Sequence, residues 1–76
     1  MERDNFMRAL RSFARRAPFR PFVVELVSGS RYLVEHPEAL AFNGGTAVYL
    51  NPFGEWSVFD HQSVAQVTDP ETAASS

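Results

Sequence analysis

The sequence predicts one small domain that is mainly β, with a single N-terminal helix packed against a strongly bent sheet. Residues 4–16 carry apolar side chains at helical spacing, whereas residues 22–68 have the pattern of five or six short strands joined by tight turns. The chain has 76 residues, enough for one core. A β meander this short hides its apolar face best when it closes into a small barrel. The alternative is an α+β domain in which the helix crosses one face of an open sheet.

The helix is expected over residues 4–16, and Asp4 or Asn5 can cap its start. Pro18 disfavours helical backbone at Ala17, so the helix should end by about residue 16. An apolar stripe along one side suits a plug for the open end of the barrel. The stripe consists of Phe6, Met7, Leu10, Phe13 and Ala14.

Apolar runs and turn sequences define the strands that follow. The expected strands span residues 22–27, 31–35, 40–43, 46–51, 55–59 and 64–68. Gly44 and Gly45 favour a two-residue hairpin, and Pro52 with Gly54 fits a type I or type II turn. Pro37 predicts a corner or a single helical turn between the second and third strands.

Composition narrows the classes of protein. The chain has no cysteine, which excludes disulfides, thiolate zinc sites and cysteine nucleophiles. No apolar run approaches the ~18 residues of a membrane span, so we expect a soluble, cytoplasmic protein without membrane contact. Residues 1–68 form the domain, and residues 69–76 lack apolar periodicity and are expected to be a flexible tail.

The sequence contains no catalytic pattern. Its serines lack the GxSxG elbow, and its glycines form no phosphate loop or dinucleotide fingerprint. The side chains able to ligate a metal or exchange protons lie in two separate turns without ligand spacing. They are His36, Glu38, Asp60 and His61. We therefore expect no enzyme activity and no catalytic, cofactor or metal site.

Charge is divided unevenly along the chain. Residues 1–20 contain six arginines and two acidic residues, a net charge of +4, whereas residues 21–76 contain one arginine and seven acidic residues, a net charge of −6. Arg8, Arg11 and Arg15 recur at spacings of three and four and therefore share the solvent-facing side of the helix. This face can bind phosphates, or it can be solvated or pair with the acidic strands of a neighbouring subunit.

Three short runs carry a resemblance to a known family. They are residues 6–11 (FMRALR), 24–29 (VELVSG) and 60–64 (DHQSV). In this order they resemble Sm-like proteins, and are most similar to the Hfq family of bacterial RNA chaperones. Residues 18–22 (PFRPF), followed by His36 and Pro37, also resemble a group of small bacterial proteins without assigned function.

The Sm-like resemblance implies a five-stranded, strongly bent, SH3-like barrel that forms a homo-oligomeric ring and binds RNA. His61 matches the family's histidine at the RNA-binding pore, and Asp60 stands where the family has lysine. Phe42 matches the aromatic residue that stacks at the pore, and Arg11 matches the basic rim patch. The candidate nucleic-acid-binding residues are accordingly Arg8, Arg11, Arg15, Arg16, Phe42 and His61.

Assembly is also expected from the strands themselves. Residues 46–50 and 64–67 contain no charge that would protect an exposed strand edge, and such edges pair with other chains. Phe53 occupies a turn tip, where an exposed phenylalanine would mark a contact surface. The candidate interface residues are Val48, Leu50, Phe53, Val64 and Val67.

Two functions therefore fit the sequence. The first is a non-enzymatic Sm-like homo-oligomer, a ring by resemblance, that binds RNA or single-stranded nucleic acid through its arginine-rich helix face. The second is a protein-interaction module that docks a partner protein through Phe53 and the acidic strands and binds no nucleic acid. Salt-dependent RNA binding would support the first function, and a protein partner without RNA binding would support the second.

Overall fold

An amphipathic helix, α1 (Arg3–Ala14), is the first element of the computed structural model, which describes residues 1–70. The carboxylate of Glu2 caps the helix by accepting hydrogen bonds from the backbone N–H groups of Asp4 and Asn5, each at 3.1 Å. The expected cap at Asp4 or Asn5 is therefore wrong, because Glu2 reaches the free N–H groups of the first turn. The helix ends at Ala14, before the limit of about residue 16 that Pro18 sets.

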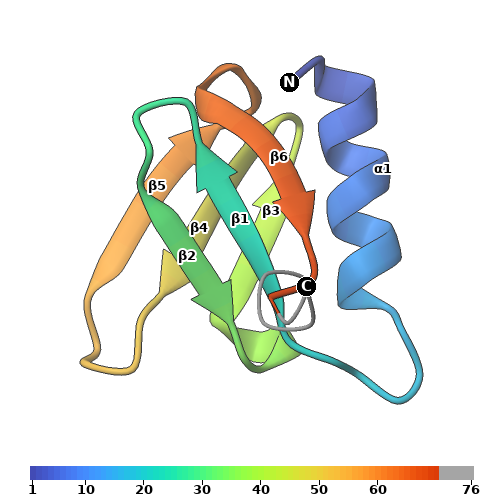
Figure 1. Ribbon diagram of the computed structural model, residues 1–76, viewed down its shortest axis with the longest axis vertical. Helices are drawn as coiled ribbons and strands as arrows, with labels where there is room; N and C mark the ends of the chain where they lie inside the picture. Colours follow the sequence, from blue (N-terminus) through green and yellow to red (C-terminus); the bar gives the residue numbers. More distant parts are fainter. Residues whose placement is uncertain (71–76) are drawn as a thin grey trace.

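Six strands follow α1 and form two antiparallel sheets of three strands each (Figure 1). The strands are β1 (Phe22–Leu26), β2 (Arg31–Val34), β3 (Leu40–Asn43), β4 (Thr46–Leu50), β5 (Trp56–Asp60) and β6 (Val64–Thr68). One sheet has the order β2–β1–β6 and the other the order β3–β4–β5. Two short 3-10 helices, η1 (Pro37–Ala39) and η2 (His61–Ser63), connect the sheets. The mainly β class with one N-terminal helix is thus confirmed.

The closed five-stranded barrel is not found in residues 1–70. Six strands are divided between two sheets, and no strand ladder joins one sheet to the other. The break occurs where η1 separates β2 from β3 and where η2 separates β5 from β6. The expectation of a free edge at residues 46–50 is also wrong, because β4 lies in the middle of its sheet and pairs with both β3 and β5.

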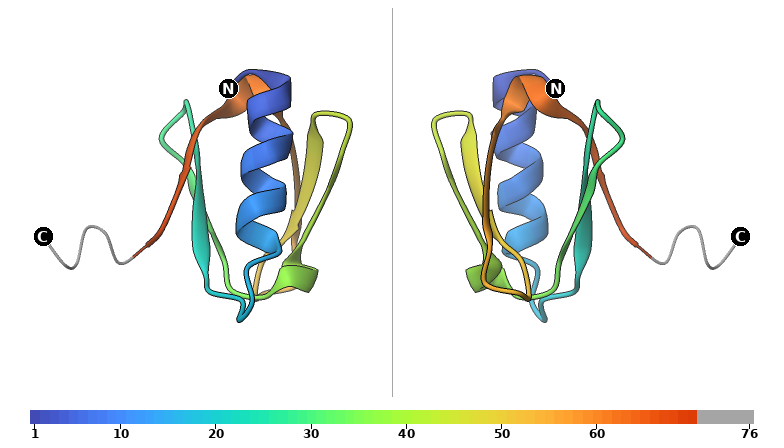
Figure 2. Two further views of the ribbon diagram at one scale, coloured as in Figure 1. Left: turned by 90° about the vertical axis from the view of Figure 1, so that its right-hand side faces the viewer. Right: turned by 90° about the vertical axis from the view of Figure 1, so that its left-hand side faces the viewer.

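The helix fills the open side between the two sheets. Figure 2 shows α1 in this gap, where it contacts β3, β6 and η2. Phe6 and Leu10 are fully buried, and the ring of Phe6 meets Phe59 of β5 edge-on, with 6.4 Å between the ring centroids. Phe13 packs against Phe22 of β1, with 5.3 Å between the ring centroids. The predicted stripe thus plugs a gap between two sheets instead of crossing one face of an open sheet.

Aromatic side chains close the side of the molecule away from α1. Tyr32 of β2 stacks on Tyr49 of β4, with 5.0 Å between ring centroids and 15° between ring planes. The Tyr32 ring also lies 5.5 Å from the ring of Phe59. These contacts join the two sheets at a place where no backbone ladder does so, and they complete the buried core. The core consists of Phe6, Leu10, Phe22, Val24, Val34, Leu40, Ala47, Tyr49, Phe59 and Val64.

The β3–β4 hairpin turns on Gly44 and Gly45, whose φ angles are 60° and 91°. Positive φ at both positions is what the predicted two-residue turn requires. Gly45 also accepts a 2.8 Å hydrogen bond from the backbone N–H of His61, so the turn holds η2 against this sheet. A Cβ atom at Gly45 would lie 2.9 Å from the His61 ring, which leaves no room for a side chain.

No helix within residues 1–70 is long and apolar enough to cross a membrane.

Candidate functional site

The β4–β5 hairpin carries most of the exposed apolar surface of the described chain. Phe53, Trp56 and Val58 are 87%, 65% and 69% exposed. Val48 and Leu50 are half-buried and pair in register with Val58 and Trp56. Because side chains alternate along a strand, these four strand residues share the outer face of the sheet, and Phe53 extends that face at the turn. We call these five residues the hairpin surface.

Asn51 fixes the turn that presents Phe53. Its side-chain Oδ1 accepts hydrogen bonds from the backbone N–H groups of Phe53 and Glu55, both at 2.9 Å. Its Nδ2 donates a 3.0 Å hydrogen bond to the carboxylate of Glu55. Asn side chains stabilise turns in this way by standing in for backbone partners. The Phe53 ring is therefore held outward by the backbone of the turn and not by packing.

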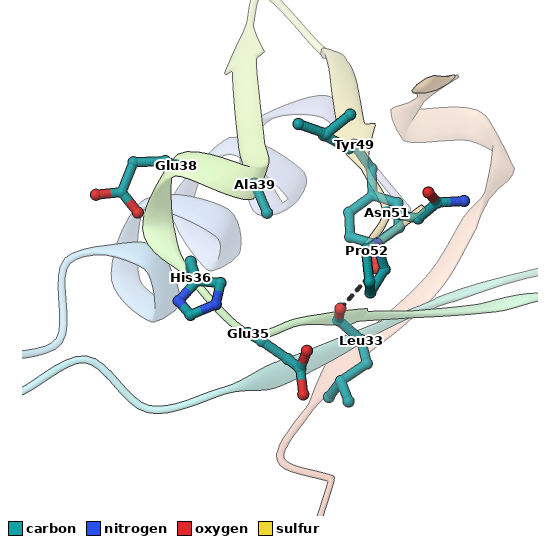
Figure 3. A pocket seen from close by; sticks show the side chains of 9 residues that line it. Leu33, Glu35, His36, Glu38, Ala39, Tyr49, Asn51 and Pro52 are labelled. Atoms are coloured by element: carbon teal, nitrogen blue, oxygen red, sulfur yellow. Dashed lines mark hydrogen bonds between the residues drawn. The ribbon is translucent and has the colours of Figure 1, made fainter. Parts of the chain in front are cut away.

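A groove of about 290 Å³ adjoins the hairpin surface (Figure 3). It lies between the end of β2, the helical turn η1 and the end of β4, and Leu50 belongs to both the groove and the hairpin surface. Glu35, His36 and Glu38 bring polar groups from the β2–β3 connection, and all three residues are exposed. The other lining residues are Leu33, Ala39, Tyr49, Asn51 and Pro52.

Tyr49 forms the floor of this groove and is nearly buried. Its hydroxyl donates a 2.7 Å hydrogen bond to the carbonyl oxygen of Leu33, drawn as a dashed line in Figure 3. Burial raises the pKa of the Tyr49 hydroxyl above 10.0, and the neighbouring Glu35 and Tyr32 raise it further. Tyr49 is therefore a neutral hydrogen-bond donor throughout the physiological pH range.

The polar residues considered for metal or proton chemistry are separated in the fold. His36 and Glu38 lie at the groove, whereas Asp60 and His61 lie at η2. Asp60 Oδ1 accepts hydrogen bonds from the backbone N–H and the hydroxyl of Ser63, at 3.2 and 3.1 Å. The His61 Nδ1 lies 3.0 Å from the carbonyl oxygen of Met1. Within residues 1–70, no three His, Cys, Asp or Glu side chains are grouped so that they could hold a metal ion.

Arg8, Arg11 and Arg15 form an exposed cationic face on α1. At 3.6 residues per turn, they lie on the side of the helix opposite Phe6 and Leu10. Within residues 1–70, the only hydrogen bond that their guanidinium groups make is a 3.1 Å bond from Arg8 to the side chain of Asn5, and none of the three forms a salt bridge. We call these three residues the arginine face.

Arg16 lies outside this face and is bound within the fold. Its guanidinium group is 2.8 Å from the carboxylate of Asp69, and it also donates to the carbonyl oxygen of Arg20 at 2.9 Å. The same group lies 4.7 Å from the centroid of the Phe13 ring. Arg16 therefore links the segment after α1 to the segment after β6, and its donors are directed inward.

The two remaining candidates for nucleic-acid binding are also part of the packing. Phe42 is half-buried and packs against the core from β3. The ring of His61 lies 6.3 Å from that of Phe6, beside Gly45. The structure thus brings together Arg8, Arg11 and Arg15, and it separates them from Arg16.

The candidate interface residues divide in the same manner. Phe53 is the most exposed large apolar residue in residues 1–70, and Val48 and Leu50 lie beside its hairpin. Val64 is fully buried in the core, and Val67 is half-buried against it, so β6 offers a neighbour its backbone edge but little side-chain surface. Trp56 and Val58 are exposed as well, although they were not among the interface residues predicted from the sequence.

The sequence contains a signal for the missed pair. Trp56 and Val58 lie on one face of the strand, and Phe59 lies on the other. Both faces of the strand therefore carry apolar side chains, and the core of so small a domain covers only one of them.

Comparison of the chain with family models, with curated proteins and with solved structures finds no match to any of them.

Proposed function

We propose that this chain is a non-enzymatic Sm-like module that acts by protein–protein contact, first of all with copies of itself, through the hairpin surface. The observation that carries this proposal is the gathering of Phe53, Trp56 and Val58 on one hairpin. Scattered exposed hydrophobic residues are normal, but a contiguous group of large ones is typical of an interaction surface. Aromatic residues of this kind contribute most to binding when a partner covers them.

The strand edges support assembly of the chain with copies of itself. In Figure 1, β6 lies beside α1, whereas β5 lies on the side of the molecule away from it. Each is the last strand of its sheet, so each has one edge without a partner within residues 1–70. Pairing of β5 in one copy with β6 in the next would be head to tail, and such contacts form rings when the rotation closes. A ring is what the Sm-like resemblance implies.

The first test is the mass of the protein in solution. Multi-angle light scattering is expected to give a multiple of the monomer mass for the wild type, and a lower mass for a variant carrying Phe53→Ser, Trp56→Ser and Val58→Thr. Val27 lies outside the hairpin surface and is 69% exposed, like Val58, so Val27→Thr is the matched control and should assemble as the wild type does. A wild type that stays monomeric at all concentrations would overturn the proposal.

A second candidate function is the binding of RNA or single-stranded nucleic acid by the arginine face. The observation that favours it is the exposure of Arg8, Arg11 and Arg15 on one side of α1. Three phosphate contacts would make binding fall steeply with salt. Fluorescence anisotropy with a single-stranded RNA tests this function: affinity should fall with added salt and be lost when all three arginines become glutamate. Absence of binding at low salt would exclude it.

A further inference from the structure

We infer that the contact between copies is charge-complementary, with the arginine face of one copy docked on the aromatic and acidic side of the next. This inference rests on the proposed self-association and names the residues that would make it. The acceptor surface combines Phe53 and Trp56 with three carboxylates, of which one lies between them in the sequence and two line the groove that adjoins the hairpin surface. We call Glu35, Glu38 and Glu55 the acidic rim.

Neither charged set forms a salt bridge within residues 1–70 of its own copy, and the side-chain hydrogen bonds of its charged groups there are from Arg8 to Asn5 and from Asn51 to Glu55. Within residues 1–70 there is one salt bridge, between Arg16 and Asp69, and it includes no member of either set. The residues of the arginine face and of the acidic rim are all exposed. Each set is therefore free to pair with a charge on another molecule.

Their positions prevent contact within one molecule. Figure 1 shows α1 along one side of the fold and the β4–β5 turn at the far lower corner. The helix is fixed in its gap because Phe6 and Leu10 are fully buried there. A helix held in this way cannot reach its own hairpin, but a second copy placed head to tail can present its helix to it. The β5–β6 pairing described above would bring that helix to the same side, because β6 lies beside α1.

The chemistry of the acceptor surface suits arginine in particular. A guanidinium group stacks on aromatic rings and binds carboxylates through a planar set of donors. Glu55 lies between Phe53 and Trp56 in the sequence, so a ring and a carboxylate are offered together. The chain already contains one arginine bound in this way, since Arg16 lies 4.7 Å from the Phe13 centroid and 2.8 Å from the Asp69 carboxylate.

The groove provides a place for one of these side chains. Its volume of about 290 Å³ is near the lower end of ligand pockets, which is enough for a single long side chain. Leu33, Ala39 and Leu50 can cover an aliphatic stem, while Glu35 and Glu38 lie where a guanidinium group would emerge. Arg8 and Arg15 are seven residues apart, a rise of about 10 Å along the helix, so the arginine face presents its charges over that length.

The test is a pair of charge-reversal variants, measured by light scattering alone and as an equimolar mixture. One variant carries Arg8→Glu, Arg11→Glu and Arg15→Glu, and the other carries Glu35→Arg, Glu38→Arg and Glu55→Arg. Alone, each variant has two like-charged surfaces and should associate about tenfold or more weakly than the wild type. In the mixture, the acidic helix of one variant meets the basic rim of the other, and assembly should return. Added salt should weaken wild-type assembly, because these pairs are exposed to solvent.

The outcomes separate this inference from the proposed function. If both variants assemble as the wild type does, or if the mixture fails to recover assembly, charge pairing does not form the contact and the inference is overturned. If at the same time the Phe53, Trp56 and Val58 variant loses assembly, the proposed function stands without it. If the helix variant loses only RNA binding and assembles normally, the arginine face is a nucleic-acid surface. Arg20→Glu, an exposed arginine outside α1, serves as the charge control and should leave assembly unchanged.

Discussion

The hydroxyl of Tyr49 donates a 2.7 Å hydrogen bond to the carbonyl oxygen of Leu33, and so connects β4 of one sheet to β2 of the other. The two sheets share no strand ladder in residues 1–70, so side-chain contacts of this kind must hold them together. The stacked ring of Tyr32 adds apolar contact at the same place.

Tyr49→Phe should lower the free energy of unfolding by about 1 kcal/mol, because the Leu33 carbonyl loses its side-chain donor while the ring packing is kept. Urea denaturation measures this change. Tyr32→Phe is the control, since its hydroxyl makes no hydrogen bond within the described residues, and it should change the stability much less. Equal effects of the two substitutions would show that the hydrogen bond contributes nothing.

The stability of the fold should decrease in alkali. Burial raises the pKa of Tyr49 in the folded state, so the unfolded chain releases this proton first as the pH rises above 10.0. The contribution of this proton to the free energy of unfolding is therefore fully present below pH 10.0, and it is lost as the pH rises through the folded-state pKa of Tyr49. Thermal unfolding of the wild type and of Tyr49→Phe across this range tests the origin of the loss. The variant should show a shallower decrease, and identical slopes would contradict the assignment to Tyr49.

Substitution of Gly45 should be more harmful than substitution of Gly29. Both residues have positive φ angles, 91° and 98°, so alanine is strained at either position. A Cβ atom at Gly29 meets nothing within 4 Å, whereas at Gly45 it would lie 2.9 Å from the ring of His61. We expect Gly29→Ala to cost about 1 kcal/mol and Gly45→Ala about 1–3 kcal/mol more, measured by denaturation. Similar costs would indicate that the His61 ring moves aside freely.

Arg16→Lys should destabilise the fold although it keeps the charge. Lysine lacks the planar fork that reaches Asp69 and the Arg20 carbonyl together, and it stacks less well on Phe13. The expected loss is about 1–2 kcal/mol of unfolding free energy. Arg15→Lys, at the exposed neighbouring position, should change the stability by less than about 0.5 kcal/mol. If both substitutions have the same small effect, the Arg16 contacts contribute little to the fold.

Local patterns predicted the elements of this fold well. The stripe containing Phe6 and Leu10 lies in the core, and Gly44 with Gly45 forms the expected hairpin turn. These features depend on residues that are close in the sequence, where periodicity and φ preferences decide the structure. The position of α1 between two sheets also follows from the apolar stripe, once the strands leave a side open.

Long-range features were not predictable in the same way. Alternation along β5 defines two faces of the strand but does not say which of them the core covers, so Trp56 and Val58 were not recognised as exposed. The division into two sheets depends on how η1 and η2 redirect the chain. The role of Arg16 depends on Asp69, which is 53 residues away in the sequence. Such pairings are decided by tertiary packing, and no local pattern records them.

The place that α1 occupies is built from β3 and β6, which belong to different sheets, and from η2, which connects the sheets; all three lie after α1 in the chain. During synthesis, the helix therefore leaves the ribosome before the strands against which it packs have been made. Until β5 and β6 emerge, the ring of Phe6 lacks its partner Phe59 and the helix lacks its contacts with β6, whereas Phe13 can already meet Phe22 of β1.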